Sequence, residues 1–126
     1  GDGGAALAEA DAIGRLGTSE AIKALVPGGL PAPDILELAG EMIRGRVARS
    51  AGDPRGAVAA YERAATIEAR LAYMEPPFWY FPVRQSLGAA WLQAGEPARA
   101  ETAFRDSLKA APNNAYALFG LAEALF

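Results

Sequence analysis

The sequence predicts an all-α protein of one domain, and three observations lead to that class. The 126 residues are 52% hydrophobic and 21% charged, as in a globular domain with a core of its own. No segment alternates apolar and polar residues over the length of a β-strand. A short motif that suits the junction between two helices recurs three times along the chain.

The recurring motif reads Gly, an acidic residue, three variable residues and then Ala. It is found in GDGGAALAEA from Gly1, GDPRGAVAAY from Gly52 and GEPARAETAF from Gly95. Gly suits the left-handed end of one helix, and the acidic residue caps the next. The small Ala allows two helices to approach closely, and the residue four positions later fills the gap beside it. These paired positions are Ala6 and Ala10, Ala57 and Tyr61, and Ala100 and Phe104.

Seven helices are predicted between these junctions and the stretches rich in Pro and Gly. The segment VPGGLPAP, residues 26–33, separates a short second helix from a long third one. Pro54 and Pro97 fit the first turn of the fourth and sixth helices, where a backbone N–H is not needed, and Pro82 begins the fifth. The predicted ranges are 3–16, 18–26, 33–51, 53–74, 82–95, 97–111 and 115–126.

Residues 81–114 resemble the tetratricopeptide repeat (TPR), a 34-residue unit of two helices. Arg84 stands where the repeat usually has Trp, and the residues that match its spacing are Leu87, Gly88, Trp91, Ala100, Phe104 and Pro112. Residues 38–71 resemble a weaker copy, in which Arg44 replaces the usual Leu and the matching residues are Gly45, Gly52, Ala57 and Tyr61. The string EPPFWYFPVRQSLGAA also resembles one near the C-terminal end of long bacterial TPR proteins that have no assigned activity.

The resemblance implies a right-handed α-solenoid, in which successive helical hairpins stack on one another. Residues 1–126 are then a single TPR-type domain and a piece of a longer protein. Its expected parts are a partial, degenerate repeat (1–37), a repeat with an extended second helix (38–71), an insertion loop (72–80), a full repeat (81–114) and a truncated repeat or terminal helix (115–126).

The aromatic stretch YMEPPFWYFPVRQSLGAAW, residues 73–91, lies where the two repeats are joined. Gly52 and Gly95 are 43 residues apart, nine more than one repeat, so the chain has an insertion between them. We expect the fourth helix to run on to Met74, about two turns beyond its usual end, before residues 75–81 return the chain. The aromatic residues of the loop either plug the space under this overhanging helix or contact a ligand. They are Phe78, Trp79 and Tyr80.

Composition and missing motifs argue against most kinds of chemistry. The chain has no His and no Cys, which removes the commonest general base and the usual zinc ligands. It contains no Gly-rich phosphate loop, nucleophile motif or metal-spaced cluster. The net charge of −3 argues against a nucleic-acid partner, and no apolar run approaches the ~18 residues of a membrane helix. We therefore expect a protein that is not an enzyme and uses no cofactor or metal.

The TPR resemblance also implies a concave groove lined by the first helix of each repeat. The second, fifth, ninth, twelfth and thirteenth residues of a repeat generally point into it. TPR receptors that clamp a carboxylate use Lys and Asn at the fifth and ninth positions, which here hold Met42 and Arg46, or Gln85 and Ala89, so that clamp is absent. The candidate ligand-binding residues are Met42, Arg46, Arg49, Gln85, Leu92, Gln93, Tyr116, Phe119 and Glu123.

The expected function is a protein-interaction module that belongs to a scaffold or adaptor. Two arginines at one end of the groove and aromatics at the other suit a peptide with an acidic residue and an apolar anchor. Arg46 and Arg49 equally fit a solvated helix face on which local acids pair with them. The alternative function is self-assembly, with a homodimer formed through helix 115–126, whose Tyr116 and Phe119 lack evident cover.

Overall fold

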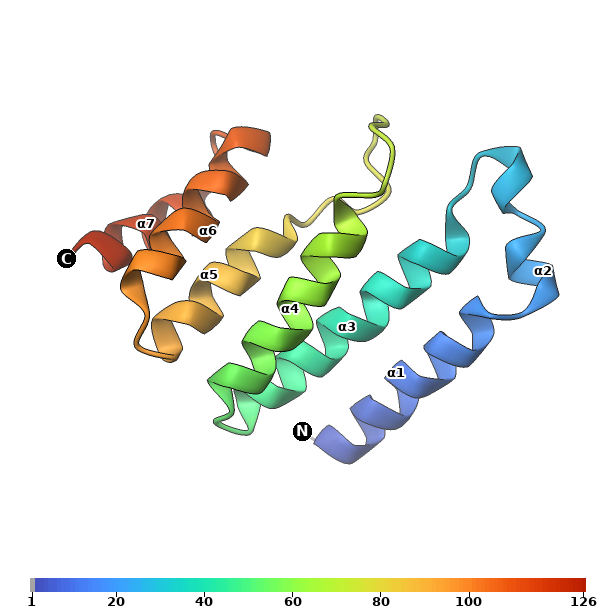
Figure 1. Cartoon of the computed structure of the whole chain (residues 1–126), viewed down its shortest axis with the longest axis horizontal. Helices are drawn as coiled ribbons and strands as arrows, with labels where there is room; N and C mark the ends of the chain where they lie inside the picture. The colour runs from blue at the N-terminus through green and yellow to red at the C-terminus, as the bar shows by residue number, and fades with distance from the viewer. Residues whose placement is uncertain (1) are drawn as a thin grey trace.

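The computed structural model describes residues 2–126 and is all-α over that range, with no β-strand. Figure 1 shows the helices following one another along the longest axis, from α1 near one end to α7 at the other. Each long helix packs mainly on the next one, in the order α1, α3, α4, α5, α6 and α7. Their bounds are α1 (Gly3–Gly17), α2 (Glu20–Lys23), a 3₁₀ turn η1 (Val26–Gly28), α3 (Ala32–Ser50), α4 (Pro54–Glu68), α5 (Val83–Gln93), α6 (Pro97–Ala110) and α7 (Ala115–Leu125).

The junctions between α3 and α4 and between α5 and α6 are built alike. Gly52 and Gly95 have φ values of 77° and 75°, a left-handed conformation that favours glycine. The Asp53 carboxylate accepts a hydrogen bond from Gly56 N at 2.8 Å and so caps α4. The turn glycines of these two predicted junctions are confirmed, but the predicted cap of α6 is not, because the Glu96 side chain makes no capping hydrogen bond and pairs with Arg55 instead. Gly1 of the first predicted junction lies outside the described residues.

Both hairpins also pack an aromatic ring directly on a glycine of the facing helix. A Cβ at Gly88 would lie only 2.7 Å from Phe104 Cε1, and a Cβ at Gly45 would overlap the Tyr61 ring. The two contacts are offset by 43 residues, which equals the predicted 34-residue repeat plus the nine-residue insertion. The small residues next to these rings are fully buried in both hairpins, at Ala57 and Ala100.

The core consists of two clusters of buried side chains. The larger cluster joins α4, α5, α6 and α7 around Tyr61, Trp91 and Phe104. The smaller one joins α3, α4 and the start of α5 around Leu38 and Ile67. The remaining predicted structural residues lie at the edge of the larger cluster and in the turn before α7; they are Leu87 and Pro112.

The prediction of a helix over residues 18–26 is wrong. Only Glu20–Lys23 is α-helical, and a 3₁₀ turn follows at Val26–Gly28. No side chain of either element is buried, so no apolar face stabilises a longer helix. Pro27 lies in the first part of this turn, and Gly29, with a φ of 89°, ends it.

The predicted extension of the fourth helix to Met74 is also wrong, because α4 ends at Glu68. There the Glu68 carboxylate accepts a hydrogen bond from Val83 N at 3.3 Å, and its other oxygen lies 4.0 Å from Arg84 Nη1. These contacts hold the end of α4 against the start of α5. Most of the residues that follow α4 are exposed, so further helical turns would bury little apolar surface. Residues 69–82 form the whole connection, and no helix overhangs it.

Candidate functional site

Arg46 and Arg49 lie one turn apart on α3, and both are exposed. Arg49 Nε donates a hydrogen bond to Gln93 Oε1 on α5 at 3.0 Å. Within residues 2–126, neither guanidinium lies within 4.0 Å of a carboxylate. The structure therefore brings three of the predicted groove residues together, and it contradicts the interpretation in which local acids pair with the two arginines.

The hydroxyl group of Tyr61 belongs to the same site. The Tyr61 ring is buried against Gly45. Burial raises the pKa of the hydroxyl, and the positive charges of Arg49 and Arg46 oppose that rise. We call Arg46, Arg49, Tyr61 and Gln93 the arginine site. The sequence analysis assigned Tyr61 to the core alone. A signal of its second role was present in the sequence: the other hairpin has Phe104, without a hydroxyl, at the equivalent position.

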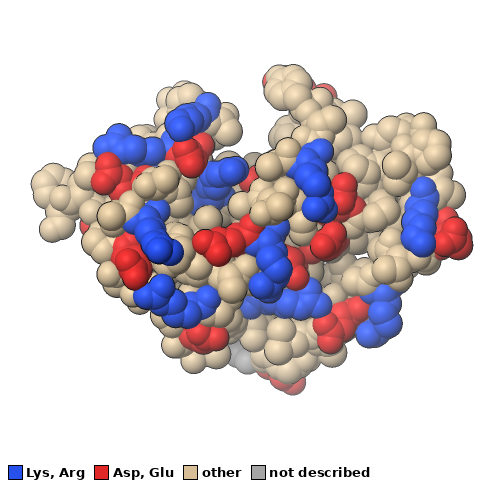
Figure 2. All heavy atoms as spheres, in the orientation of Figure 1, with Lys and Arg blue, Asp and Glu red and all other residues tan. Residues whose placement is uncertain are grey.

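Arginines elsewhere on α3 and α4 are paired with carboxylates. Arg44 lies 2.6 Å from Asp11 and 3.3 Å from Glu41, and Glu41 also pairs with Arg63 at 2.8 Å. This network connects α1, α3 and α4. Figure 2 shows basic and acidic groups interspersed over one face of the molecule, with no large patch of one sign. In the arginine site, by contrast, neither guanidinium is paired with a carboxylate of residues 2–126, so both can bind an acidic partner.

Gln85 is not a free groove residue, contrary to the prediction. The residue is only 7% exposed, and its Oε1 accepts a hydrogen bond from Asn114 Nδ2 at 2.6 Å. Asn114 also caps α7, because its side-chain oxygen accepts a hydrogen bond from Ala117 N at 3.1 Å. Gln85 therefore ties α5 to the start of α7.

The other predicted groove residues differ in exposure. Met42 and Leu92 are half-buried and pack against the larger core cluster, so only part of each side chain meets solvent. On α7, Tyr116 and Phe119 are 73% and 66% exposed, and Glu123 is exposed as well. These three α7 residues are accessible as predicted.

An aromatic row links the connection 69–82 to α7, which the sequence did not reveal. The ring of Phe81 lies 5.8 Å from that of Tyr80 and 6.3 Å from that of Tyr116, measured between centroids. All three rings are exposed. The row therefore adds two loop aromatics to the aromatic residues predicted on α7.

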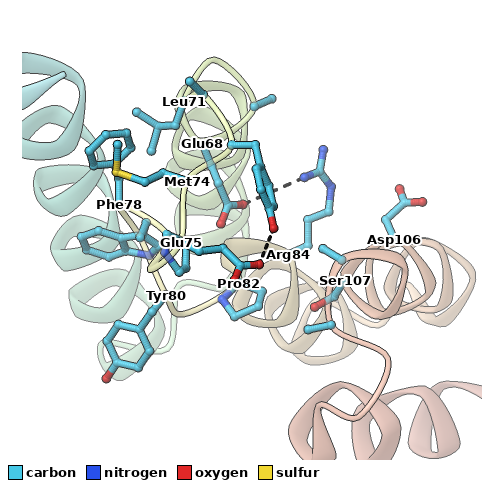
Figure 3. A pocket seen from close by; sticks show the side chains of 17 residues that line it. Glu68, Leu71, Met74, Glu75, Phe78, Tyr80, Pro82, Arg84, Asp106 and Ser107 are labelled. Carbon is cyan, nitrogen blue, oxygen red and sulfur yellow. Dashed lines mark hydrogen bonds and ion pairs between the residues drawn. The ribbon is translucent and has the colours of Figure 1, made fainter. Parts of the chain in front are cut away.

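The connection 69–82 also encloses a pocket of about 450 Å³, which we call the loop pocket. Figure 3 shows its wall, which is made by the loop itself, the end of α4, the start of α5 and the last turns of α6. Trp79 is half-buried, packs against the smaller core cluster and lines the pocket. Phe78 is half-buried too, whereas Tyr80 is 81% exposed. Trp79 thus supports the connection, but there is no overhanging helix for it to plug.

The carboxylates of the loop pocket all have partners within the protein. Burial raises the pKa of the Glu68 carboxyl, and the hydrogen bond from Val83 N and the charge of Arg84 oppose that rise. A hydrogen bond from Lys109, at 2.7 Å, lowers the pKa of the Asp106 carboxyl. Figure 3 shows Arg84 between these two carboxylates.

Two absences apply to residues 2–126. No group of three or more His, Cys, Asp or Glu side chains could hold a metal ion. No helix of this range is long and apolar enough to cross a membrane. A comparison with known protein families, with curated proteins and with solved structures finds no match. What the chain does must therefore be inferred from the arginine site and its surroundings.

Proposed function

We propose that the chain is a TPR-type helical repeat module that binds an acidic peptide or protein segment at the arginine site. The observation that carries the proposal is the pair of exposed arginines without a carboxylate partner among residues 2–126. Gln93 already orients Arg49, so less side-chain entropy is lost when a partner binds. Arg46 adds a second donor for charge-assisted hydrogen bonds.

The repeated packing of the two hairpins supports the TPR-type part of the proposal. The same ring-on-glycine contact and the same left-handed glycine occur in both, 43 residues apart. In the proposed architecture, a right-handed solenoid, α3, α5 and α7 are the first helices of successive units and line its concave face. The hydrogen bond between Arg49 on α3 and Gln93 on α5 fits neighbouring helices of such a face.

The aromatic row supplies the apolar part of the proposed binding surface. Tyr80, Phe81 and Tyr116 present exposed rings, and Phe119 lies on the same helix as Tyr116. A fitting partner carries an acidic residue for the arginine site and a large apolar side chain for the rings. The proposal contains no catalytic step, and its partner is a protein segment rather than a nucleic acid or a membrane.

A peptide-display selection against the folded protein tests this proposal. We expect the enriched peptides to carry Asp or Glu at a constant distance from a large apolar residue. Replacing Arg46→Ala together with Arg49→Ala should weaken binding of a selected peptide by about 10- to 100-fold, because a hydrogen bond to a charged group contributes about 1.5 kcal/mol. Both arginine side chains are exposed, so the helical content should not change.

Arg15→Ala is the matched control for these two substitutions. Arg15 is an exposed arginine on α1 that also has no carboxylate within 4.0 Å in the described chain. Its replacement should leave the affinity for the selected peptide unchanged. The proposal is contradicted if the enriched peptides lack acidic residues, or if the double variant binds them as tightly as the parent does.

Self-association through α7 is the second candidate function, and one observation favours it. Phe119 is 66% exposed on α7, a helix whose only charged residue is Glu123. Sedimentation at micromolar concentration should then show a dimer that Phe119→Glu dissociates. Tyr73→Glu, at an aromatic residue that is 88% exposed in the loop, should leave the dimer intact. A monomeric parent protein under these conditions would exclude this candidate.

A further inference from the structure

The loop pocket has the size of a small-molecule site. Its volume of about 450 Å³ falls within the range of about 300 to 1,000 Å³ that is usual for ligand pockets. Its apolar wall includes Leu71, Met74, Phe78 and Pro82 (Figure 3). Of the residues that line this pocket, the function proposed above uses only Tyr80.

Two polar atoms in the residues that line the pocket are buried and have no hydrogen-bond partner. They are Trp79 Nε1 and Ser107 Oγ. Buried polar groups in folded proteins nearly always have a partner. An indole N–H can only donate, and a serine hydroxyl can donate as well. Both atoms therefore lack an acceptor.

Comparison of the two hairpins shows that packing does not require the hydroxyl of Ser107. The residue 43 positions earlier is Ala64, which is fully buried between its own helices. Ser107 is equally buried, at 1% exposure. A methyl group thus suffices at this position of a hairpin, and only the position beside the loop pocket has the hydroxyl. Figure 3 shows Ser107 on the side of α6 that faces Pro82.

The charges around the pocket disfavour an anionic occupant. Three carboxylates, those of Glu68, Glu75 and Asp106, line it against the single guanidinium of Arg84. Each carboxylate already has a donor within the protein: Val83 N for Glu68, the Tyr73 hydroxyl for Glu75, and Lys109 for Asp106. An anionic ligand would be repelled by the net negative charge. A simple cation offers no acceptor, so it would leave Trp79 Nε1 and Ser107 Oγ without a partner.

We infer that the loop pocket binds a neutral, largely apolar molecule whose carbonyl oxygens accept hydrogen bonds from Trp79 Nε1 and Ser107 Oγ. Its apolar part lies against Met74 and Phe78. A free small molecule of this kind and an uncharged hydrophobic peptide segment share the same chemistry.

Nuclear magnetic resonance of the ¹⁵N-labelled protein tests the inference, because the chain has only two tryptophans. The probes are N-acetyl-phenylalanine amide, which is neutral, its free acid, and the capped tripeptide acetyl-Ala-Phe-Ala-amide. We expect the neutral amide to shift the indole N–H signal of Trp79 saturably at millimolar concentration. The Trp91 signal should stay in place, because Trp91 does not line this pocket. Trp79→Phe assigns the two signals.

Ser107→Ala should weaken binding of the neutral amide by about tenfold and leave the fold intact, since Ala64 fills the equivalent position. Ser86→Ala is the matched control, a half-buried serine on α5 that does not line the pocket, and it should not change the affinity. The free acid should bind more weakly than the amide. Tighter binding of the tripeptide than of the amide would indicate that the natural ligand is a protein segment. Equal binding of the two would indicate a free small molecule. Either result upholds the inference.

Three results would overturn it. The first is the absence of a saturable Trp79 shift with any neutral probe. The second is an equal shift of the Trp91 signal, which would indicate nonspecific contact. The third is unchanged affinity in the Ser107→Ala protein, or tighter binding of the free acid than of the amide.

Discussion

The hairpins α3–α4 and α5–α6 place equivalent residues 43 positions apart in the sequence, and their differences separate what packing requires from what it leaves open. The buried positions agree closely. A ring lies on a glycine in both hairpins, Tyr61 on Gly45 and Phe104 on Gly88. The exposed positions do not agree: the residues equivalent to Arg46 and Arg49 in the second hairpin are Ala89 and Leu92.

The two hairpins also use their charges differently. In the first, Arg44 joins α1 to α3 by its contacts with Asp11 and Glu41. In the second, the ring of Trp91 has the guanidinium of Arg99 at 4.7 Å and that of Arg55 at 5.7 Å from its centroid. The shared packing builds the scaffold, while each hairpin has its own surface chemistry. For this reason the arginines of the arginine site occur only in the first hairpin, although Gln93 of the second hairpin contacts Arg49.

The largest expected effect comes from removing the ring of one hairpin. Phe104→Ala should lower the free energy of unfolding by about 3–5 kcal/mol, as is usual for a buried Phe, and it should also loosen α7, whose Gly120 lies against the same ring. Tyr61→Phe, which gives the first hairpin the ring of the second, should cost less than about 1 kcal/mol. Urea unfolding measures both values. Similar losses for the two variants would show that the Tyr61 hydroxyl contributes to packing and not only to the arginine site.

An intermediate effect is expected in the connection between the hairpins. Trp79→Ala should cost about 2 kcal/mol, less than the 3–5 kcal/mol of a fully buried aromatic residue, because Trp79 is only half-buried. Tyr80→Ala is the control and should change the stability by less than about 0.5 kcal/mol, because the side chain is exposed. Thermal melts compare the two. A negligible loss for Trp79→Ala would mean that the connection does not hold the two hairpins together.

The smallest effect concerns Glu68, which joins the end of the first hairpin to the start of the second. Its carboxyl has a pKa above the ordinary 4.5 in the folded protein, mainly because it is buried. The folded state therefore binds a proton more readily than the unfolded chain does. This group's contribution to stability should decrease as the pH rises from 4.5 through the raised folded pKa.

Glu68→Gln tests this contribution, because the amide keeps an acceptor for Val83 N–H and does not titrate. The difference in stability between parent and variant, measured by urea unfolding, should change across that pH window and be constant above it. At neutral pH the variant should be at least as stable as the parent. A loss of more than about 1 kcal/mol there would mean that the pair with Arg84 outweighs the burial of the charge.

The local signals in the sequence predicted most of the helices correctly. The left-handed glycines Gly52 and Gly95 and the prolines after them mark junctions through short-range backbone geometry, and the structure has both junctions. Predictions failed where the outcome depended on burial. Residues 18–26 can form a helix locally, but no side chain of α2 packs in the core. The end of α4 depends on a contact between Glu68 and Val83, which are separated by the whole connection.

The candidate site shows the same division. The sequence identified Arg46, Arg49 and Gln93 as candidates through their place in a repeat, because repeat position depends only on spacing along the chain. It could not show that no acid among residues 2–126 pairs with the arginines, or that the Tyr61 hydroxyl lies beside them. Nor could it show that Gln85, 29 residues before Asn114, is used up in a buried hydrogen bond.

By itself, the sequence determined the helical class, the two main junctions and the equivalence of the two hairpins, because helix caps, glycine conformation and residue spacing act over a few neighbouring residues. Only the tertiary structure decided where α4 ends, which polar side chains are engaged and that the connection 69–82 encloses a pocket. These features depend on atoms brought together from distant parts of the chain. Burial and long-range hydrogen bonds exist only once the helices have packed.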